Sequence, residues 1–563
     1  MKNLVVFAFM AVLASASPAW AEPFAELRAA YAARDAVAAA GAYAPEGQVV
    51  YRYDRAREER YRGTKRIASS FKALFDQIDA KDKLDLNFRE TARVGNRVLG
   101  LYRLRIGKAQ ASFGHYDVVL SASGRFVSDT STSARRGDFE EAAGPVLLNS
   151  DDETLDRNYY AQLTGRYRRA DGCTLVVTRS AVRLFVRNSC SNDWRGLSRQ
   201  SGRIWTAGDR VRSDKQVATY RFAPIRGLAS PSVEVSVAQE KHIAVRSAVY
   251  QTEDVSFRSS DGTMIAGTIY KPSNGEKPRA ATVMLHGSGP QDRDGYASII
   301  AVFADEIAAS GRVVLAFDKR GSGGSDGDGD RASFGVLAAD ARAAMEYLAK
   351  RTEVDPSRIG LAGSSQAGWV AAKVIADGAL PADVLLLGAA GTALTVAEQN
   401  LYNTEVRMRC QGIDAPDVRL ALEQQKAFFD FLRNPATGRK LDALTAEARS
   451  RPALRDWLLP DSSTTDRTAG AWYVVLDPFF DPLPVWQRYP GKVTFLFSEF
   501  DDSTPTKVVQ ARLNSMGTKT TTLLGAQHLG LATRNVCKGD LPDVSRFVPG
   551  LMPAVAHYAM SEE

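Results

Sequence analysis

Two serines of this 563-residue chain lie in short glycine-containing motifs that can hold a catalytic nucleophile. Residues 323–327 read GGSDG around Ser325, and residues 363–367 read GSSQA around Ser365. A nucleophilic serine of this kind follows a strand and precedes a helix, because the strained turn between them exposes its hydroxyl oxygen above the sheet. The hydroxyl attacks a carbonyl carbon once a neighbouring base takes its proton.

The surrounding sequence favours Ser365. Ser325 lies among glycines and aspartates some way after the apolar run RVVLAF, which indicates a flexible turn. Ser365 lies between the strand-like run RIGLAG and the helical pattern QAGWVAAKVIADG. Ala367 occupies the last glycine position of the motif, but it adds only a methyl group where helix meets strand, and Gly368 follows it. We therefore predict that Ser365 is the nucleophile and that GGSDG is a turn.

An acid and a base follow the serine along the chain. The run FLFSEFDD ends with Asp501 and Asp502, and the run LLGAQH ends with His528. Neighbouring residues at a strand end point in different directions, so only one of the two aspartates can orient the imidazole. His528 is the predicted base that takes the serine proton, and both aspartates are candidates for the acid.

Backbone N–H groups must also point to where negative charge develops on the substrate oxygen. Gln366, the residue after the nucleophile, is expected to supply one of them. The glycine-rich run MLHGSGPQDRDG, residues 284–295, follows an early strand and lets the backbone approach a substrate closely. Ser288 is our first candidate for the second donor and Gly287 the alternative. His286 is expected to be a structural partner of this loop rather than a second base.

The elements that must position these residues are strands alternating with helices from about residue 250 onward. Apolar runs such as AATVMLHGSG, RVVLAFDKRG and ADVLLLGAA alternate with helical patterns such as LAADARAAMEYLAKR. This order is typical of the α/β class, with a mostly parallel sheet buried on both faces. Ligands bind such sheets beyond the carboxyl ends of the strands, which is where the candidate residues lie.

A connection of about 100 residues, approximately 391–491, separates ADVLLLGAA from KVTFLFSEFDD. Connections of this length normally have a function. Its helical stretch APDVRLALEQQKAFFDFLRN predicts a helical cap over the active site. Trp457, Trp472 and Trp486 could line an apolar pocket there, or they could pack the cap itself.

Residues 250–563 resemble the α/β-hydrolase superfamily, and within it the bacterial esterase and acyl-peptidase-like branches. The resemblance rests on the motifs HGSGPQDRDG, FDKRGSGGSDG, IGLAGSSQAGW and SEFDDSTP. Serine, acid and histidine occur in this order in the superfamily. Its acid turn usually reads G-x-x-D-x-x-V-P, so Asp501 and Pro505 match the pattern, whereas Ser498 and Thr504 depart from it. The resemblance therefore favours Asp501 over Asp502.

This resemblance implies a serine hydrolase that cleaves carboxylic esters through an acyl-enzyme on Ser365, with Asp501 and His528 and with no metal or organic cofactor. The expected substrate is a small ester or peptide-like molecule. A serine peptidase or amidase of the same fold is an alternative, and a non-catalytic binding protein on a degenerate hydrolase scaffold is another. The sequence favours the esterase because no site for gripping a peptide terminus is evident. It does not define the oligomeric state.

Two smaller domains are expected before the α/β domain. Residues 22–145 carry an alanine-rich helical pattern, an aromatic-alternating segment, a second helix and two strands, which predicts a small α+β domain. Its runs YAPEG and GTKRIASSF resemble the SnoaL-like cone-shaped fold, which implies an accessory role. Residues 150–245 consist of short alternating runs separated by turn residues and predict a small all-β module.

Residues 1–21 predict a secretory signal peptide, with one lysine, a short apolar core and AWA before the cleavage point. The apolar core is shorter than the roughly 20 residues that span a bilayer, so no membrane span is expected. The predicted localisation is periplasmic or secreted.

An oxidising compartment favours two disulfides among the four cysteines. The simplest pairing joins Cys173 to Cys190 and Cys410 to Cys537, and four unpaired thiols are the alternative. The net charge of +7 is spread along the chain without a dense basic run, so no nucleic-acid partner is expected.

Overall fold

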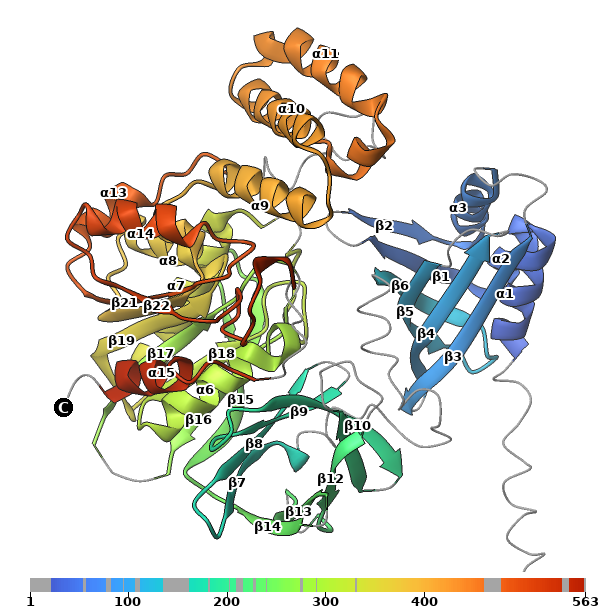
Figure 1. Cartoon of the computed structure of the whole chain (residues 1–563). Helices are drawn as coiled ribbons and strands as arrows, with labels where there is room; N and C mark the ends of the chain where they lie inside the picture. Colours follow the sequence, from blue (N-terminus) through green and yellow to red (C-terminus); the bar gives the residue numbers. More distant parts are fainter. Residues whose placement is uncertain are drawn as a thin grey trace, which may run out of the picture. The chain divides into compact units, whose positions relative to one another are not determined.

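The computed structural model describes residues 22–53, 57–76, 83–94, 96–106, 112–134, 162–180, 183–201, 203–208, 216–225, 229–238, 240–273, 277–289, 291–329, 332–459, 477–538 and 546–560. The predicted signal peptide and Trp472 lie outside these ranges. None of the helices within them is both long and apolar enough to cross a membrane. The chain divides into two compact units, residues 1–159 and 160–563 (Figure 1).

The first unit contains a six-stranded sheet and helices that share one apolar core with it. The strand order is β2-β1-β6-β5-β4-β3, in which β1 and β6 are parallel and the other neighbours are antiparallel. Helix α3 contributes Ile67, Phe71 and Phe75 to the core, a spacing of four residues that places them on one helix face. The elements are α1 (Glu22–Ala33), α2 (Ala36–Gly41), β1 (Tyr43–Tyr53), β2 (Arg57–Arg62), α3 (Thr64–Asp76), β3 (Leu84–Val94), β4 (Arg97–Ile106), β5 (Ser112–Leu120) and β6 (Phe126–Ala134).

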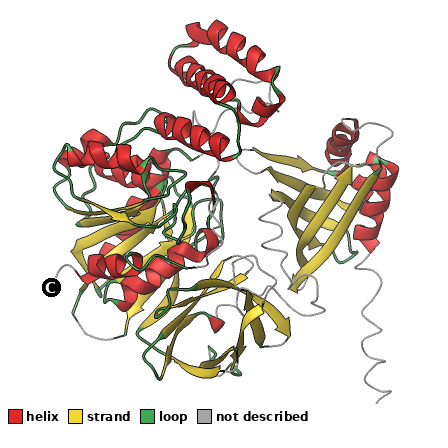
Figure 2. Ribbon diagram, viewed as in Figure 1, coloured by secondary structure: helices red, strands yellow, loops and turns green. Residues whose placement is uncertain are grey.

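The second unit begins with a closed antiparallel β-barrel in which the first strand, β7, pairs with the last, β14 (Figure 2). Phe185 on β9 belongs to the apolar cluster of the following domain. Its neighbours Leu184 and Val186 are buried and point the opposite way, into the barrel. The strands are β7 (Gly165–Arg169), β8 (Thr174–Ser180), β9 (Arg183–Asn188), β10 (Trp194–Ser201), β11 (Ile204–Gly208), β12 (Gln216–Phe222), β13 (Ser232–Val237) and β14 (Glu240–Arg246).

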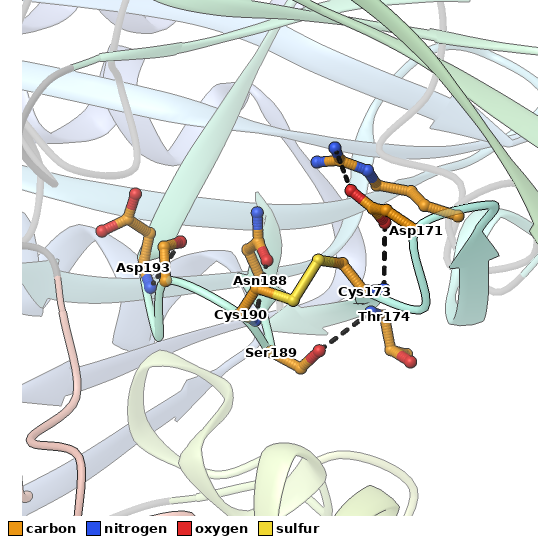
Figure 3. The surroundings of a disulfide bond; sticks show 9 residues. Asp171, Cys173, Thr174, Asn188, Ser189, Cys190 and Asp193 are labelled. Atoms are coloured by element: carbon orange, nitrogen blue, oxygen red, sulfur yellow. Dashed lines mark hydrogen bonds and ion pairs between the residues drawn. A yellow bond between two sulfur atoms is a disulfide. The ribbon is translucent and has the colours of Figure 1, made fainter.

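Both predicted disulfides are present. The Cys173–Cys190 bond joins the turn after β7 to the turn after β9. Next to it, the Ser189 hydroxyl accepts the Thr174 N–H and the Asn188 side chain accepts the Cys190 N–H (Figure 3). The Cys410–Cys537 bond joins two segments of the following domain that are 127 residues apart.

The rest of the second unit is built on an eight-stranded sheet of order β15-β16-β18-β17-β19-β20-β21-β22. Strands β17 to β22 pair with one another in parallel. Strand β16 pairs antiparallel with both β15 and β18. Along β18, Val313 and Leu315 join one apolar cluster and Val314 joins the other, which explains the continuous apolar run. The strands are β15 (Tyr250–Arg258), β16 (Met264–Pro272), β17 (Arg279–Leu285), β18 (Val313–Phe317), β19 (Val354–Ser364), β20 (Asp383–Leu387), β21 (Lys492–Ser498) and β22 (Thr520–Leu523).

Helices cover both faces of this sheet, so the predicted α/β class is confirmed. Helices α6 and α15 contribute to the apolar cluster on one face, and α7, α8 and α14 to the cluster on the other. These helices are α6 (Ile299–Ala309), α7 (Phe334–Ala349), α8 (Ala367–Ala376), α14 (Thr506–Asn514) and α15 (Leu551–Met560).

The connection between β20 and β21 is mostly helical where the structure describes it. Helix α9 starts with a capping box formed by Thr395 and Glu398. Trp486 packs on the sheet core against Phe495, and Trp457 packs among the helices of the connection. The elements are α9 (Val396–Cys410), α10 (Ala415–Arg433), α11 (Gly438–Arg449), a 3₁₀ turn η5 (Pro452–Trp457) and α13 (Leu483–Arg488).

Candidate active site

Ser365 forms the turn between strand β19 and helix α8 and has a φ of 57°. A non-glycine residue seldom adopts this left-handed conformation, and where it does the strain often marks a functional site. The Ser365 N–H donates to the carbonyl of Leu387 at the end of β20, at 3.0 Å. The turn therefore holds the predicted nucleophile at the carboxyl end of the central parallel strands.

Close packing around this turn explains its small residues. A β-carbon at Gly363 would lie 2.6 Å from Ala367 Cβ, and one at Gly368 would lie 2.9 Å from Ala389 Cβ. Real β-carbons do not approach so closely, so glycine is required at both positions for helix α8 to pack on the sheet. Ala367 itself is fully buried. The methyl group at the motif's last position fits because Gly363, which it faces, has no β-carbon.

Ser325 has a different environment. Its hydroxyl donates to the carbonyl of Asp318 at 2.7 Å and accepts the N–H of Ala266 at 2.9 Å. The side chain thus pins the turn after β18 to strand β16. This structural role agrees with the prediction that GGSDG is a turn.

His528 and Asp501 lie side by side and are both buried, with 7% and 2% of their surface exposed. The Nδ1 atom of His528 is 2.9 Å from each carboxylate oxygen of Asp501. Asp501 Oδ1 also accepts the backbone N–H groups of Ser503 at 2.8 Å and Thr504 at 2.7 Å. The carboxylate is therefore fixed by its own turn and faces the imidazole.

Asp502 faces helix α9 instead. Its Oδ2 atom lies 3.4 Å from Nε of Arg407 on α9, and its Oδ1 accepts the Ser503 hydroxyl. The two adjacent aspartates thus point in different directions, and the structure brings Asp501 rather than Asp502 to the histidine.

Gly388, directly after β20, connects the serine and the histidine regions. A β-carbon at this position would lie 3.1 Å from His528 Nδ1 and 3.2 Å from Asp501 Oδ2. The preceding residue, Leu387, accepts the N–H of Ser365. One short segment at the end of β20 therefore contacts the Ser365 turn on one side and the His528–Asp501 pair on the other.

The loop after β17 lies against the same turn. A β-carbon at Gly287 would be 3.8 Å from Ser365 Cβ, which places this loop beside the serine. The ammonium of Lys319 donates to the carbonyls of Gly287 at 3.1 Å and Gly289 at 3.0 Å, and to Oε1 of Gln366 at 2.8 Å. Lys319 is 4% exposed. A single buried cation thus joins both segments that are candidates for the oxyanion hole.

His286 is a buried structural residue, as expected. Its Nε2 lies 2.6 Å from the carbonyl of Phe317. Burial, with a smaller effect of the Lys319 charge, lowers the pKa of His286 from 6.5 to about 3. The imidazole is therefore neutral at ordinary pH and donates a hydrogen bond to the end of β18.

Helix α9 packs on the acid turn. The Tyr402 hydroxyl donates to the backbone carbonyl of Asp501 at 2.8 Å, and Gln399 donates to the carbonyl of Ser503 at 2.9 Å. Burial and the nearby charge of Asp501 raise the pKa of Tyr402 to about 12, so this hydroxyl keeps its proton. The Cys410–Cys537 bond ties the end of α9 to the segment that follows His528. The first helix of the connection is thus attached to both the acid and the histidine segments.

Residues 282–535 match the model of the family described as the alpha/beta hydrolase family. This part of the chain has the α/β hydrolase fold. Among the described residues of the chain, no cluster of three or more His, Cys, Asp or Glu side chains could hold a metal ion.

Curated relatives match segments of about 120 residues of this chain. An uncharacterized protein of Mycobacterium tuberculosis strain H37Rv is 38% identical over 118 residues, which is 21% of this chain and 39% of that protein. YtaP of Bacillus subtilis, named as a candidate hydrolase, is 30% identical over 120 residues, 18% of this chain and 40% of that protein. This chain thus spans about two fifths of the length of these relatives.

Among solved structures, the Pyrococcus furiosus esterase Pf2001 is 12% identical and has a TM-score of 0.35. It covers 55% of this chain, and the match covers 90% of the esterase.

Two residues of the hydrolase site were not singled out from the sequence, Lys319 and Gly388. Lys319 stands in the motif FDKRGSGGSDG, two residues after the apolar run RVVLAF, and this closeness to the carboxyl end of a strand is the available signal. Gly388 directly follows the apolar run of β20. A glycine at a strand's carboxyl end is the available signal that another group approaches closely there.

Proposed function

We propose that this protein is a serine hydrolase that cleaves carboxylic esters through an acyl-enzyme on Ser365. The observation that carries the proposal is the meeting, at the ends of β19 and β20, of a strained serine turn and a buried histidine–aspartate pair. The Leu387 carbonyl accepts the Ser365 N–H at 3.0 Å, and a β-carbon added at the next residue, Gly388, would lie 3.1 Å from His528 Nδ1. The match of residues 282–535 to the alpha/beta hydrolase family model supports hydrolysis as the reaction class.

In the proposed mechanism, the protonated Nδ1 of His528 donates a hydrogen bond to the Asp501 carboxylate. This tautomer leaves Nε2 as the basic atom, which takes the proton from the Ser365 hydroxyl as the oxygen attacks the carbonyl carbon. The imidazolium then gives the proton to the departing alkoxide. Water, activated by the same nitrogen, attacks the acyl-enzyme and releases the acid, which restores Ser365.

The oxyanion is proposed to rest on the backbone N–H groups of Gln366 and Ser288, with Gly287 as the alternative second donor. Lys319 supports both segments, because it binds the carbonyls on either side of Ser288 and the side chain of Gln366. A peptide unit whose carbonyl is held by a buried cation has its N–H directed the other way. Donors fixed in advance stabilise developing charge without reorganisation.

An ester is the proposed substrate rather than an amide, since we identify no group that would bind a peptide terminus. The helical connection is proposed to act as the cap that selects the substrate, and α9 is its base on the acid turn. Two disulfides in a chain that begins with a signal-like segment support a periplasmic or secreted location.

The test is turnover of the purified protein on p-nitrophenyl esters of increasing chain length, beside amino-acid p-nitroanilides, with Ser365→Ala as the control. Ester hydrolysis that vanishes in Ser365→Ala is the expected result. Cleavage of the anilides instead would assign the protein to the peptidases. Equal ester turnover in wild type and Ser365→Ala would refute the proposal.

A further inference from the structure

The β-barrel contacts the C-terminal part of the loop that follows β17, at Asp294 and Ser298. The guanidinium of Arg179 on β8 donates to Asp294 Oδ2 at 3.1 Å, and the pair is largely buried. One residue earlier on the same strand, the Thr178 hydroxyl is 2.8 Å from the Ser298 hydroxyl, and both are buried. Barrel side chains thus hold two points of a loop that belongs to the hydrolase domain.

The contacted end of the loop has an unusual backbone. Ser298 has a φ of 62° and is completely buried, and a β-carbon at Gly295 would meet Ile300 at 2.6 Å. A left-handed serine costs conformational energy, so surrounding contacts must hold it. The Thr178 hydroxyl is one such contact. The loop therefore depends on the barrel at a place where its backbone is strained.

The other end of the loop is held by the turn after β18. Lys319 binds the carbonyls of Gly287 and Gly289. Asp318 accepts the backbone N–H of Arg293 at 2.7 Å and pairs with its guanidinium at 2.8 Å. Arg293 and Asp294 are adjacent in the loop. Asp318 of the hydrolase domain therefore holds one of them, and Arg179 of the barrel holds the next.

The barrel is docked firmly enough to serve as a support. Arg187 on β9 pairs with Glu306 on α6 at 3.0 Å, and Arg187 is 3% exposed. Phe185 and Trp194 stack on each other within the apolar cluster of the hydrolase domain, and Trp194 also contacts Phe547. Buried ion pairs and aromatic packing of this kind resist rigid-body motion between two domains.

A second barrel contact leads toward the histidine. The Phe547 N–H donates to the carbonyl of Asn192, in the turn that Cys190 closes, at 3.0 Å. Phe547 forms a β-bridge with Leu531, and Val548 donates to the carbonyl of Gly530 at 3.0 Å. Residues 530–531 lie directly after the His528 segment. The barrel thus contacts the 286–298 loop directly, and it is connected to the segment after His528 through the hydrogen bonds of residues 547–548.

We propose that the β-barrel is a positioning part of the active site, and that Arg179 and Thr178 hold the 286–298 loop so that its backbone donor meets the oxyanion. This inference rests on the proposed serine-hydrolase function and adds to it residues from outside the hydrolase domain. In this proposal the barrel supports the 286–298 loop and does not itself bind substrate. Displacement of a catalytic group by about 1 Å can cost on the order of 100-fold in rate.

The test measures two quantities in Arg179→Ala, Asp294→Ala and the double variant. One is kcat and KM on a p-nitrophenyl ester, and the other is hydrogen–deuterium exchange of peptides that cover residues 286–298. Arg169→Ala is the matched control. Among the described residues, Arg169 forms its ion pair with Asp171, within the barrel, at 2.6 Å. Arg179→Lys, which keeps the charge, is the conservative variant.

The expected result is a fall in kcat of about 10-fold in each single variant with KM within about twofold, since the loop donor acts mainly on the transition state. The double variant should lose no more than either single one, because both remove the same contact. Exchange in the loop should rise in parallel, and Arg179→Lys should recover part of the kcat.

Equal kcat and equal loop exchange in Arg179→Ala and Arg169→Ala would overturn the proposal. Faster loop exchange together with an unchanged kcat would also overturn it, since the Arg179–Asp294 contact would then not affect catalysis. If turnover in the wild type does not depend on Ser365, the proposed function fails, and the exchange data alone then decide whether the barrel holds the loop.

Discussion

The Nδ1 atom of His528 lies 2.9 Å from both carboxylate oxygens of Asp501. This arrangement fixes which nitrogen of the imidazole carries the proton, because a carboxylate accepts hydrogen bonds and does not donate them when ionised. The basic nitrogen is then Nε2, the atom that a serine hydroxyl would need.

Replacing each of the two neighbouring aspartates by asparagine should change kcat by very different amounts. Asp501→Asn should lower kcat by about 10⁴-fold, because an amide can stabilise the wrong imidazole tautomer and carries no charge to balance the imidazolium. Asp502→Asn should lower kcat by less than about threefold, since Asp502 faces Arg407 on helix α9. Steady-state kinetics on one p-nitrophenyl ester measures both. Similar losses in the two variants would show that the acid has been misassigned.

The two serine motifs predict a second contrasting pair. Ser365→Ala should remove turnover by at least about 10⁴-fold and leave the free energy of unfolding within about 1 kcal/mol. Ser325→Ala should instead cost about 1–3 kcal/mol of unfolding free energy, because its half-buried hydroxyl bonds both Asp318 and Ala266. Its turnover per folded molecule should stay near that of the wild type. Urea unfolding beside kinetics checks the pair, and loss of turnover in folded Ser325→Ala would contradict it.

Lys319→Met should lower kcat by about 10- to 100-fold with a smaller change in KM. The ammonium binds two loop carbonyls and Gln366, and methionine fills a similar volume without any donor. The carbonyls would then be free to turn, and the N–H groups of the loop would turn with them. Circular dichroism verifies folding of the variant, and an unchanged kcat in a folded protein would show that Lys319 only packs the loop.

The pH dependence of stability should contain a contribution from His286. Its pKa is about 3 in the folded chain and 6.5 when unperturbed, so between these values the unfolded chain binds the extra proton. The free energy of unfolding therefore falls as the pH falls through this window, by about 1.4 kcal/mol per pH unit from this group. His286→Gln should remove that slope. Urea unfolding at several pH values between 4.5 and 6.5 measures it, and equal slopes in the two proteins would contradict the assignment.

The sequence predicted those parts of the site that depend on local order. The strand before Ser365 and the helix after it were readable from apolar spacing, and they separated Ser365 from the better literal match at Ser325. The α/β class followed in the same way, since runs such as the one from Val313 to Phe317 are apolar at every position because both faces are covered.

Contacts between distant segments were not readable in this way. Closure of the barrel requires β7 to pair with β14, about 75 residues later, and no local pattern marks that partner. Lys319 acts through carbonyls about 30 residues away, and carbonyls are present at every residue. Gly388 is required by atoms of His528 and Asp501, which only the folded chain brings to it.

The most direct test of the central claim is reaction of the purified protein with a fluorophosphonate probe, followed by mass-spectrometric mapping of the labelled residue. An activated serine beside a buried histidine–aspartate pair should be phosphonylated, so we predict one label per chain, on Ser365, and none in Ser365→Ala. Absence of label from the folded wild-type protein, or a label on another serine such as Ser325, would contradict the assignment of Ser365 as the nucleophile.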